Sequence, residues 1–130
     1  MNDVFACHLA CQDGRVTDAV SHHARVKHGI DWVDNITEPG INKILAENID
    51  TSVIKSIKRK IPISIHHHGS NVIFISGHPK CAGNPAGKEE QIKHLRDAKK
   101  TVESFGFGVN IVLLWIENDW ATVKEIDPAL

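Results

Sequence analysis

Residues 71–83 read NVIFISGHPKCAG, and this stretch decides the fold. Residues 71–76 are apolar and rich in β-branched side chains, which is typical of a short strand buried on both faces of a parallel sheet. Residues 77–83, which contain Gly and Pro, predict a loop at the end of that strand. We therefore expect a buried parallel strand that ends in a polar loop.

The sequence on both sides of this stretch alternates between strand and helix patterns. Further strands are expected at residues 3–10, 30–36 and 109–116. Helical spacing of apolar residues predicts four helices. The first covers residues 18–28, with Thr17 as N-cap and Gly29 as its end, and the second begins at Ile41. The third begins at Asp50 or Thr51 and is interrupted at Pro62, and the fourth covers residues 87–104. Residues 120–126 alternate like an edge strand.

Strands separated by helices predict βαβ units, right-handed crossovers and a largely parallel sheet. We expect one α/β domain over residues 1–130. Its mainly parallel four-stranded sheet has the order 2-1-3-4, is flanked by helices, and is extended by an antiparallel edge strand at residues 120–126.

Composition and charge exclude several classes of protein. Hydrophobic residues make up 42% and charged residues 24% of the 130 residues, the mix of a globular domain. A net charge of -1 argues against a nucleic-acid partner. The longest apolar run, residues 111–116, is far shorter than the ~20 residues that span a bilayer, so no membrane partner is expected. Residues 1–3 do not resemble the start of a signal peptide.

Cysteines and histidines are the unusual residues of this sequence. Three cysteines are an odd and sparse set, which favours the reducing cytoplasm over a disulfide framework. Cys7, within a strand, is expected in the core, and His8 is expected to be packed or partly exposed. Trp115 and Trp120 are expected to pack in the core or at an interface. The expected surface groups of a polar helix are His22, His23 and His28. Contact with the carbonyls at a helix end is expected for His66, His67 and His68.

Two polar loops that follow predicted strands carry metal-binding residue types, at residues 11–15 and 77–83. In open α/β sheets, ligands bind beyond the carboxyl ends of the strands, where the strand order reverses. With the order 2-1-3-4, that reversal falls between these two loops.

His78 and Cys81 are three residues apart, an ordinary spacing for two ligands of one zinc ion. Cys7 and Cys11 are four steps apart in a strand, which at ~3.3 Å per residue separates them by roughly 13 Å. They cannot both reach one ion unless the strand breaks, so Cys11 alone, at the strand end, is the expected third ligand. Three protein ligands with an open fourth position are the layout of a catalytic zinc site.

Asp13 has two alternative roles in this arrangement. Its carboxylate can bind the zinc as the fourth ligand, or it can pair with Arg15 through a bidentate contact. In the second case the zinc holds water, whose pKa it lowers to ~7.

The pattern C-x-D-x-R at residues 11–15, together with G-H-x-x-C at residues 77–81, resembles the signature of β-class carbonic anhydrases. The resemblance covers most of the chain and indicates a small, divergent member with a β-carbonic-anhydrase-like fold. It implies zinc ligands and a catalytic pair that orients the zinc-bound water: Cys11, His78 and Cys81 for the metal, and Asp13 and Arg15 for the pair.

The function that the resemblance implies is a zinc lyase that hydrates carbon dioxide reversibly to bicarbonate by zinc-bound hydroxide. The family also implies a homodimer or higher homo-oligomer, because its pockets are lined from two subunits. Two alternatives remain open at this point. One is a zinc-binding relative without this activity, in a regulatory or assembly role, and the other is a hydrolase of another small substrate such as carbonyl sulfide or carbon disulfide.

Overall fold

The apolar run at the centre of the sequence forms strand β3 (Val72–Gly77), and all six of its residues are buried. The computed structural model describes residues 3–127. Within them β3 is the middle strand of a five-stranded sheet, whose order is β2-β1-β3-β4-β5. The other strands are β1 (Phe5–Ala10), β2 (Trp32–Thr37), β4 (Asn110–Ile116) and β5 (Val123–Ile126).

The pairing of the strands confirms the predicted sheet. β1 runs parallel to both β2 and β3, with Leu9 opposite Ile36 on one side and Ile75 on the other. β3 and β4 are also parallel, and β5 is the antiparallel edge strand beside β4. The carboxyl ends of β1 and β3 therefore lie side by side, at the point where the order reverses.

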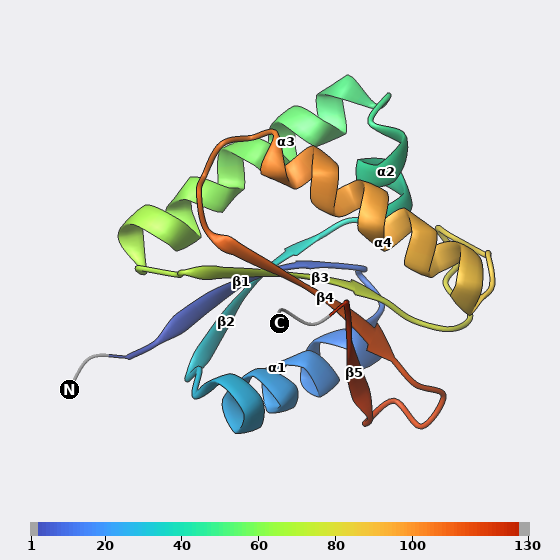
Figure 1. Ribbon diagram of the computed structural model, residues 1–130, viewed down its shortest axis with the longest axis horizontal. Helices are drawn as coiled ribbons and strands as arrows, with labels where there is room; N and C mark the ends of the chain where they lie inside the picture. Colours follow the sequence, from blue (N-terminus) through green and yellow to red (C-terminus); the bar gives the residue numbers. More distant parts are fainter. Residues whose placement is uncertain (1–2, 128–130) are drawn as a thin grey trace.

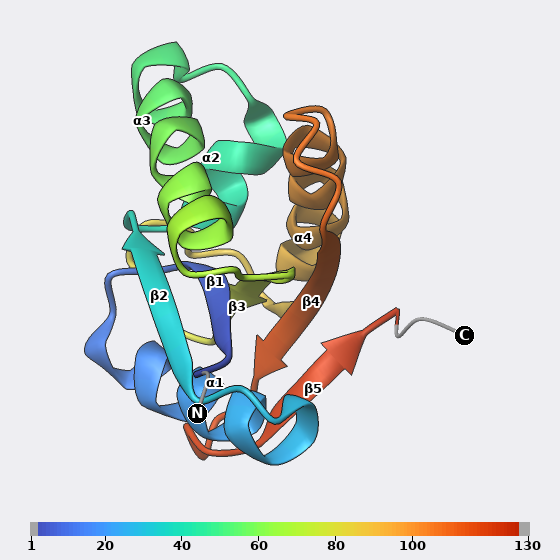
Figure 2. The ribbon, with the colours of Figure 1, turned by 90° about the vertical axis from the view of Figure 1, so that its left-hand side faces the viewer.

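Helices cover both faces of the sheet (Figures 1 and 2). One face carries α1 (Gly14–His28) alone. The other carries α2 (Ile41–Glu47), α3 (Thr51–Pro62) and α4 (Lys88–Glu103). Strand side chains alternate between these layers, so β1 sends Cys7 and Leu9 to the three-helix side. The prediction that Cys7 is a core residue is confirmed, since its side chain is fully buried.

The prediction for the start of α1 was wrong. Thr17 is not the N-cap, because the Asp13 carboxylate already accepts a hydrogen bond from the Arg15 N–H at 3.0 Å and starts the helix at Gly14. The other end is confirmed, since Gly29 closes the helix in a left-handed conformation with φ 64°.

The edge strand is shorter than predicted. Residues 120–122 continue the turn at residues 118–119 instead, because the Asp119 carboxylate accepts hydrogen bonds from the backbone N–H groups of Ala121 and Thr122, at 3.0 and 2.8 Å. The turn sets Trp120 at φ 58°. β5 begins only at Val123.

The end of α3 also differs from a simple helix. After Pro62 the chain continues as a short π-helical segment, Ile63–His67. The α-helix is therefore interrupted at Pro62, as expected. His68 does not meet helix carbonyls, because its imidazole hydrogen-bonds the Asp34 carboxylate at 2.7 Å and stacks on the ring of Phe5. Among the described residues, no helix combines the length and the apolar character needed to cross a membrane.

Candidate metal centre

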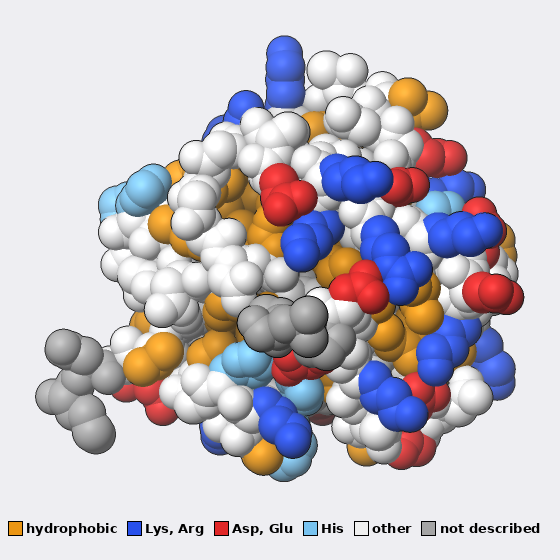
Figure 3. Space-filling view, in the orientation of Figure 1, with side chains coloured by type: hydrophobic (Ala, Val, Ile, Leu, Met, Phe, Trp, Pro, Cys, Tyr) orange, Lys and Arg blue, Asp and Glu red, His pale blue; other side chains and the backbone are white. Residues whose placement is uncertain are grey.

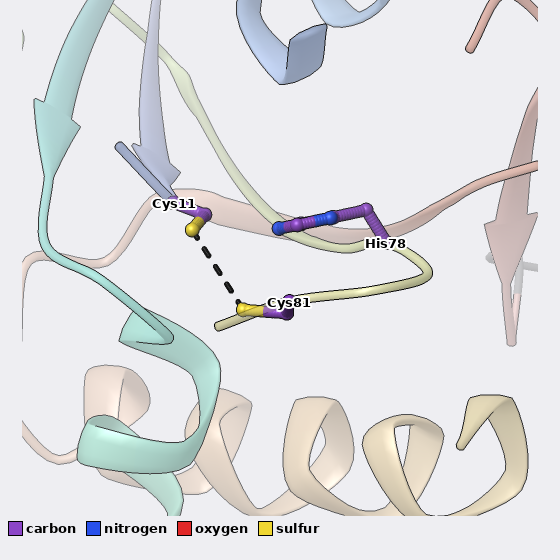
Figure 4. Close-up of side chains that lie close together, drawn as sticks. All are labelled: Cys11, His78 and Cys81. Carbon is purple, nitrogen blue, oxygen red and sulfur yellow. Dashed lines mark hydrogen bonds between the residues drawn. The ribbon is translucent and has the colours of Figure 1, made fainter. Parts of the chain in front are cut away.

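Two loops far apart in the sequence meet at the carboxyl edge of the sheet. Cys11 is the first residue after β1, and His78 is the first after β3. Because β1 and β3 are parallel neighbours, these two residues leave the sheet on the same side. The following turn brings Cys81 back toward Cys11. The structure thus gathers the three residues that the sequence nominated as ligands (Figure 4).

The geometry of these three residues fits a zinc ion. Their ligand atoms all lie within 4.8 Å of one another, and the Sγ atoms of Cys11 and Cys81 are 3.8 Å apart. Two sulfur atoms bound to one tetrahedral zinc at ~2.3 Å each are separated by roughly 3.8 Å. All three residues are buried, so water does not compete freely for their ligand atoms.

The imidazole of His78 has one nitrogen in a hydrogen bond and one without a hydrogen-bond partner. Its Nδ1–H donates to the carbonyl oxygen of Pro79 at 2.8 Å, which leaves the lone pair on Nε2. Within residues 3–127, Nε2 is the one buried side-chain nitrogen or oxygen without a hydrogen-bond partner. Burying a nitrogen without a hydrogen-bond partner costs free energy of folding, and a bound metal ion would supply the missing partner.

The electrostatics of the cluster favour a bound cation. Burial opposes ionisation of Cys11, but the neighbouring His78 imidazole and the backbone of Gly40 and Asp13 lower the pKa of this thiol to about 6. Burial and the adjacent Cys11 sulfur raise the pKa of Cys81. Two neighbouring thiolates repel each other, so ionising both sulfurs is unfavourable, and a bound divalent cation would offset this repulsion.

The loop that carries Cys81 is held by a contact between two backbones. Gly83 lies against Pro39 and Gly40, at the start of α2. A Cβ atom on Gly83 would be 2.5 Å from the Pro39 carbonyl carbon, and one on Gly40 would be 2.5 Å from that of Gly83. Only glycines permit this approach, and it fixes the position of the Cys81 loop relative to Cys11.

Sequence reasoning missed the residue that holds His78. The side chain of Gln91, fully buried on α4, accepts a hydrogen bond from the His78 N–H at 3.3 Å and donates to the His78 carbonyl at 2.8 Å. Its oxygen also accepts a hydrogen bond from Asn42 at 3.2 Å. A polar residue on the inner face of an otherwise amphipathic helix was the available signal.

Asp13 and Arg15 form a bidentate pair beside the cluster. Arg15 Nε donates to Asp13 Oδ1 at 3.0 Å, and Nη2 donates to Oδ2 at 2.8 Å. These hydrogen bonds hold the pKa of the Asp13 carboxyl at about 2. Of the two roles that the sequence left open for Asp13, this geometry corresponds to the pairing with Arg15.

Trp120 completes the surroundings of the pair and was expected only to pack. The Arg15 guanidinium lies 3.8 Å from the centre of the Trp120 ring, a cation–π contact. The same ring is 5.7 Å from the His78 imidazole. Trp120 therefore links the Asp13–Arg15 pair to one of the candidate ligands.

His8 is close to Cys11 in sequence, but its side chain is a hydrogen-bonded part of the core. It is fully buried, and its Nδ1–H donates to Asn35 Oδ1 at 2.9 Å while Nε2 accepts from the Ser76 hydroxyl at 2.7 Å. Burial lowers the pKa of His8 to about 4. The side chain is a neutral cross-link between β1, β2 and β3.

A family model described as "Putative carbonic anhydrase" matches residues 1–127. The chain belongs to this carbonic anhydrase family. The predicted family resemblance is thereby confirmed. No protein in the curated set matches the sequence significantly.

Crystal structures of β-carbonic anhydrases share the fold. The enzyme of Aspergillus fumigatus superimposes with a TM-score of 0.55 at 14% identity, over 100% of this chain and 78% of that one. A tetrameric β-carbonic anhydrase of Sordaria macrospora gives 0.55 at 13% identity, over 98% and 83%. A carbonic anhydrase of Streptococcus mutans gives 0.52 at 16% identity, over 94% and 81%. The β-carbonic-anhydrase-like architecture of this family member is therefore established.

Proposed function

We propose that this family member is a zinc-dependent lyase that reversibly hydrates carbon dioxide to bicarbonate. The observation that carries the proposal is the buried Cys11, His78 and Cys81 cluster, whose sulfur separation of 3.8 Å suits one tetrahedral zinc. Family membership and fold support the same reaction. Zinc held by three protein ligands lowers the pKa of a water molecule to ~7, which supplies a nucleophile at neutral pH.

The residues around the cluster have separate tasks in this proposal. Cys11, His78 and Cys81 would hold the metal, with the fourth position available to water. Asp13, kept as a carboxylate by Arg15, accepts a hydrogen bond from the reacting water and so orients its lone pair toward carbon dioxide. Arg15 also keeps Asp13 from closing the open side, which favours an enzyme over a relative without turnover.

Zinc analysis coupled to a stopped-flow hydration assay tests the function. We expect zinc to remain with the purified protein and carbon dioxide hydration to depend on it, with activity lost on chelation and restored by zinc. Full zinc loading with no hydration between pH 6 and 9 would contradict the lyase and support a zinc-binding relative. Turnover of carbonyl sulfide or carbon disulfide alone would instead support the hydrolase.

We also propose that the protein assembles at least as a homodimer. The outer strands of the described sheet are β2 and β5, and Trp32 on β2 is 54% exposed. Open strand edges favour pairing, and the related Sordaria macrospora enzymes are tetrameric. Light scattering at micromolar concentration should give at least twice the mass of one chain. A monomer throughout would oppose both the assembly and a pocket shared between subunits.

The proposed compartment is the cytoplasm. Cys7, Cys11 and Cys81 are all free thiols, and free thiols used as metal ligands suit a reducing environment.

A further inference from the structure

A second group of metal-binding side chains lies away from the candidate zinc centre. His23 and His28 come from the second half of α1, and Glu125 comes from β5, about a hundred residues later in the chain. Their ligand atoms all lie within 4.8 Å of one another. Figure 3 shows histidine side chains gathered on the lower part of the molecular surface, where α1 and β5 lie in Figure 1.

The placement of His23 corrects the sequence-based expectation. His22, His23 and His28 were predicted to be surface groups of a polar helix, but His23 is buried, with 8% of its surface exposed. β5 lies beside this part of α1, and its Glu125 hydrogen-bonds His23. His22 points to solvent, as expected.

The contacts within the cluster converge on one atom. Nε2 of His23 and Nε2 of His28 each lie 2.8 Å from the same oxygen, Oε2 of Glu125. The two imidazole rings are 5.7 Å apart and steeply inclined to each other. Three different side chains thus present their ligand atoms to one small region.

These distances suit a metal ion with adjacent ligands at right angles. Two donor atoms, each at ~2.1 Å from one ion and at right angles to each other, are separated by roughly 3.0 Å. The 2.8 Å contacts of Glu125 with each imidazole are close to this separation, and the Nε2 atoms of His23 and His28 lie within 4.8 Å of each other, so small movements of the three side chains would admit the ion. Two imidazoles and one carboxylate are a known donor set for zinc and related divalent ions.

Space for further ligands exists beside the cluster. His28 and Glu125 line a cavity of about 220 Å³, together with Asn110 and Lys99. Asp127 also lines the cavity, but its carboxylate is held by Arg96 at 2.6 and 3.0 Å. Water can therefore complete the coordination from this side.

We propose that His23, His28 and Glu125 form a second binding site for a divalent transition-metal ion of the zinc type, which ties the edge strand β5 to α1. The site uses no residue of the Cys11, His78 and Cys81 cluster. It is independent of the proposed lyase activity, and binding at one site does not require the other.

Zinc and cobalt are the probes that test this site. Equilibrium dialysis of the wild-type protein should give two zinc ions per chain. His28→Gln and Glu125→Gln should each lose one of them, while His22→Gln, an exposed histidine on the same helix, should keep both. Cobalt bound to thiolates gives a sulfur-to-metal charge-transfer absorption, which the first site has and the second lacks. That absorption should survive in both His28→Gln and Glu125→Gln.

The result that overturns the proposal is a zinc stoichiometry and affinity that His28→Gln and Glu125→Gln both leave the same as in the wild type. The wild-type protein also gives an answer without substitution. A second equivalent of zinc should shift the imidazole nitrogen NMR signals of His23 and His28. Unchanged signals would identify the cluster as ion pairs between α1 and β5 that bind no metal. Failure of the lyase proposal would appear instead as absent hydration, whichever zinc stoichiometry is found.

Discussion

Arg15→Ala is expected to keep its zinc and to lose carbon dioxide hydration by roughly 100-fold or more, the scale of a lost general acid–base function. In the native protein Arg15 holds both carboxylate oxygens of Asp13. Without the guanidinium, Asp13 is an anion two residues from Cys11 that is held only by its capping hydrogen bond from the backbone N–H of residue 15. It should then bind the metal and exclude water. The measurement is zinc content beside stopped-flow activity between pH 6 and 9.

The pH dependence of this variant identifies the cause. Hydroxide competes better with a carboxylate as its concentration rises, so part of the activity of Arg15→Ala should return toward pH 9. Arg25→Ala is the matched control, because Arg25 lies on the same helix and contacts only the Asp31 carbonyl among its described hydrogen bonds. It should retain wild-type activity. Wild-type activity in Arg15→Ala would show that the pair does not gate the site.

Asp13 should be replaced by Asn rather than Ala when its own role is measured. Asp13 caps α1 through the Arg15 N–H, and loss of such a cap costs about 1 kcal/mol of stability. Asn preserves the cap but carries no charge. This substitution therefore separates the carboxylate's part in catalysis from its part in folding.

Cys81→Ser is expected to lose most of the zinc at the first site. A serine hydroxyl does not ionise at neutral pH, so Cys11 and His78 would remain as only two protein ligands. Cobalt substitution makes the result specific, because the charge-transfer absorption of bound thiolates reports this site and not the His23, His28 and Glu125 cluster. A chelator competition gives the change in affinity.

Cys7→Ala is the control for Cys81→Ser. Cys7 is fully buried in β1 and packs in the core on the three-helix side. Burial also raises the pKa of its thiol to about 12, so it offers no thiolate. This variant should bind zinc as the wild type does. Full zinc occupancy in Cys81→Ser, or loss of zinc in Cys7→Ala, would contradict the ligand assignment.

The sheet could be predicted because its signals are local. Apolar strands such as residues 71–76, separated by amphipathic helices, specify parallel crossovers, and the strand order follows from few alternatives. The meeting of Cys11 with His78 then follows, since both come directly after neighbouring parallel strands. The spacing of residues within the two motifs, at residues 11–15 and 77–81, is also visible directly in the sequence.

Other features depend on contacts that no local pattern encodes. His23 lies in a polar stretch of α1, yet it is buried and hydrogen-bonded to Glu125 of β5, at the other end of the chain. Trp120 reaches Arg15 because the Asp119 turn holds its backbone at φ 58°. Asp13 starts the helix because one carboxylate serves both the backbone and the Arg15 guanidinium. Each case needs the tertiary structure before the residue's role becomes visible.

The long separation between Cys11 and Cys81 has a consequence for the order of folding. Only His78 and Cys81 are close together in an unfolded chain, so the complete ligand set arises after β1 and β3 have paired across α1, β2, α2 and α3. Pairings of this range form late, because the loop that they close is long. A metal that binds only the paired state shifts the equilibrium toward it by mass action. Zinc at the proposed centre would therefore stabilise the paired state of β1 and β3, and the rate at which a refolding chain acquires zinc would report the formation of this strand pair.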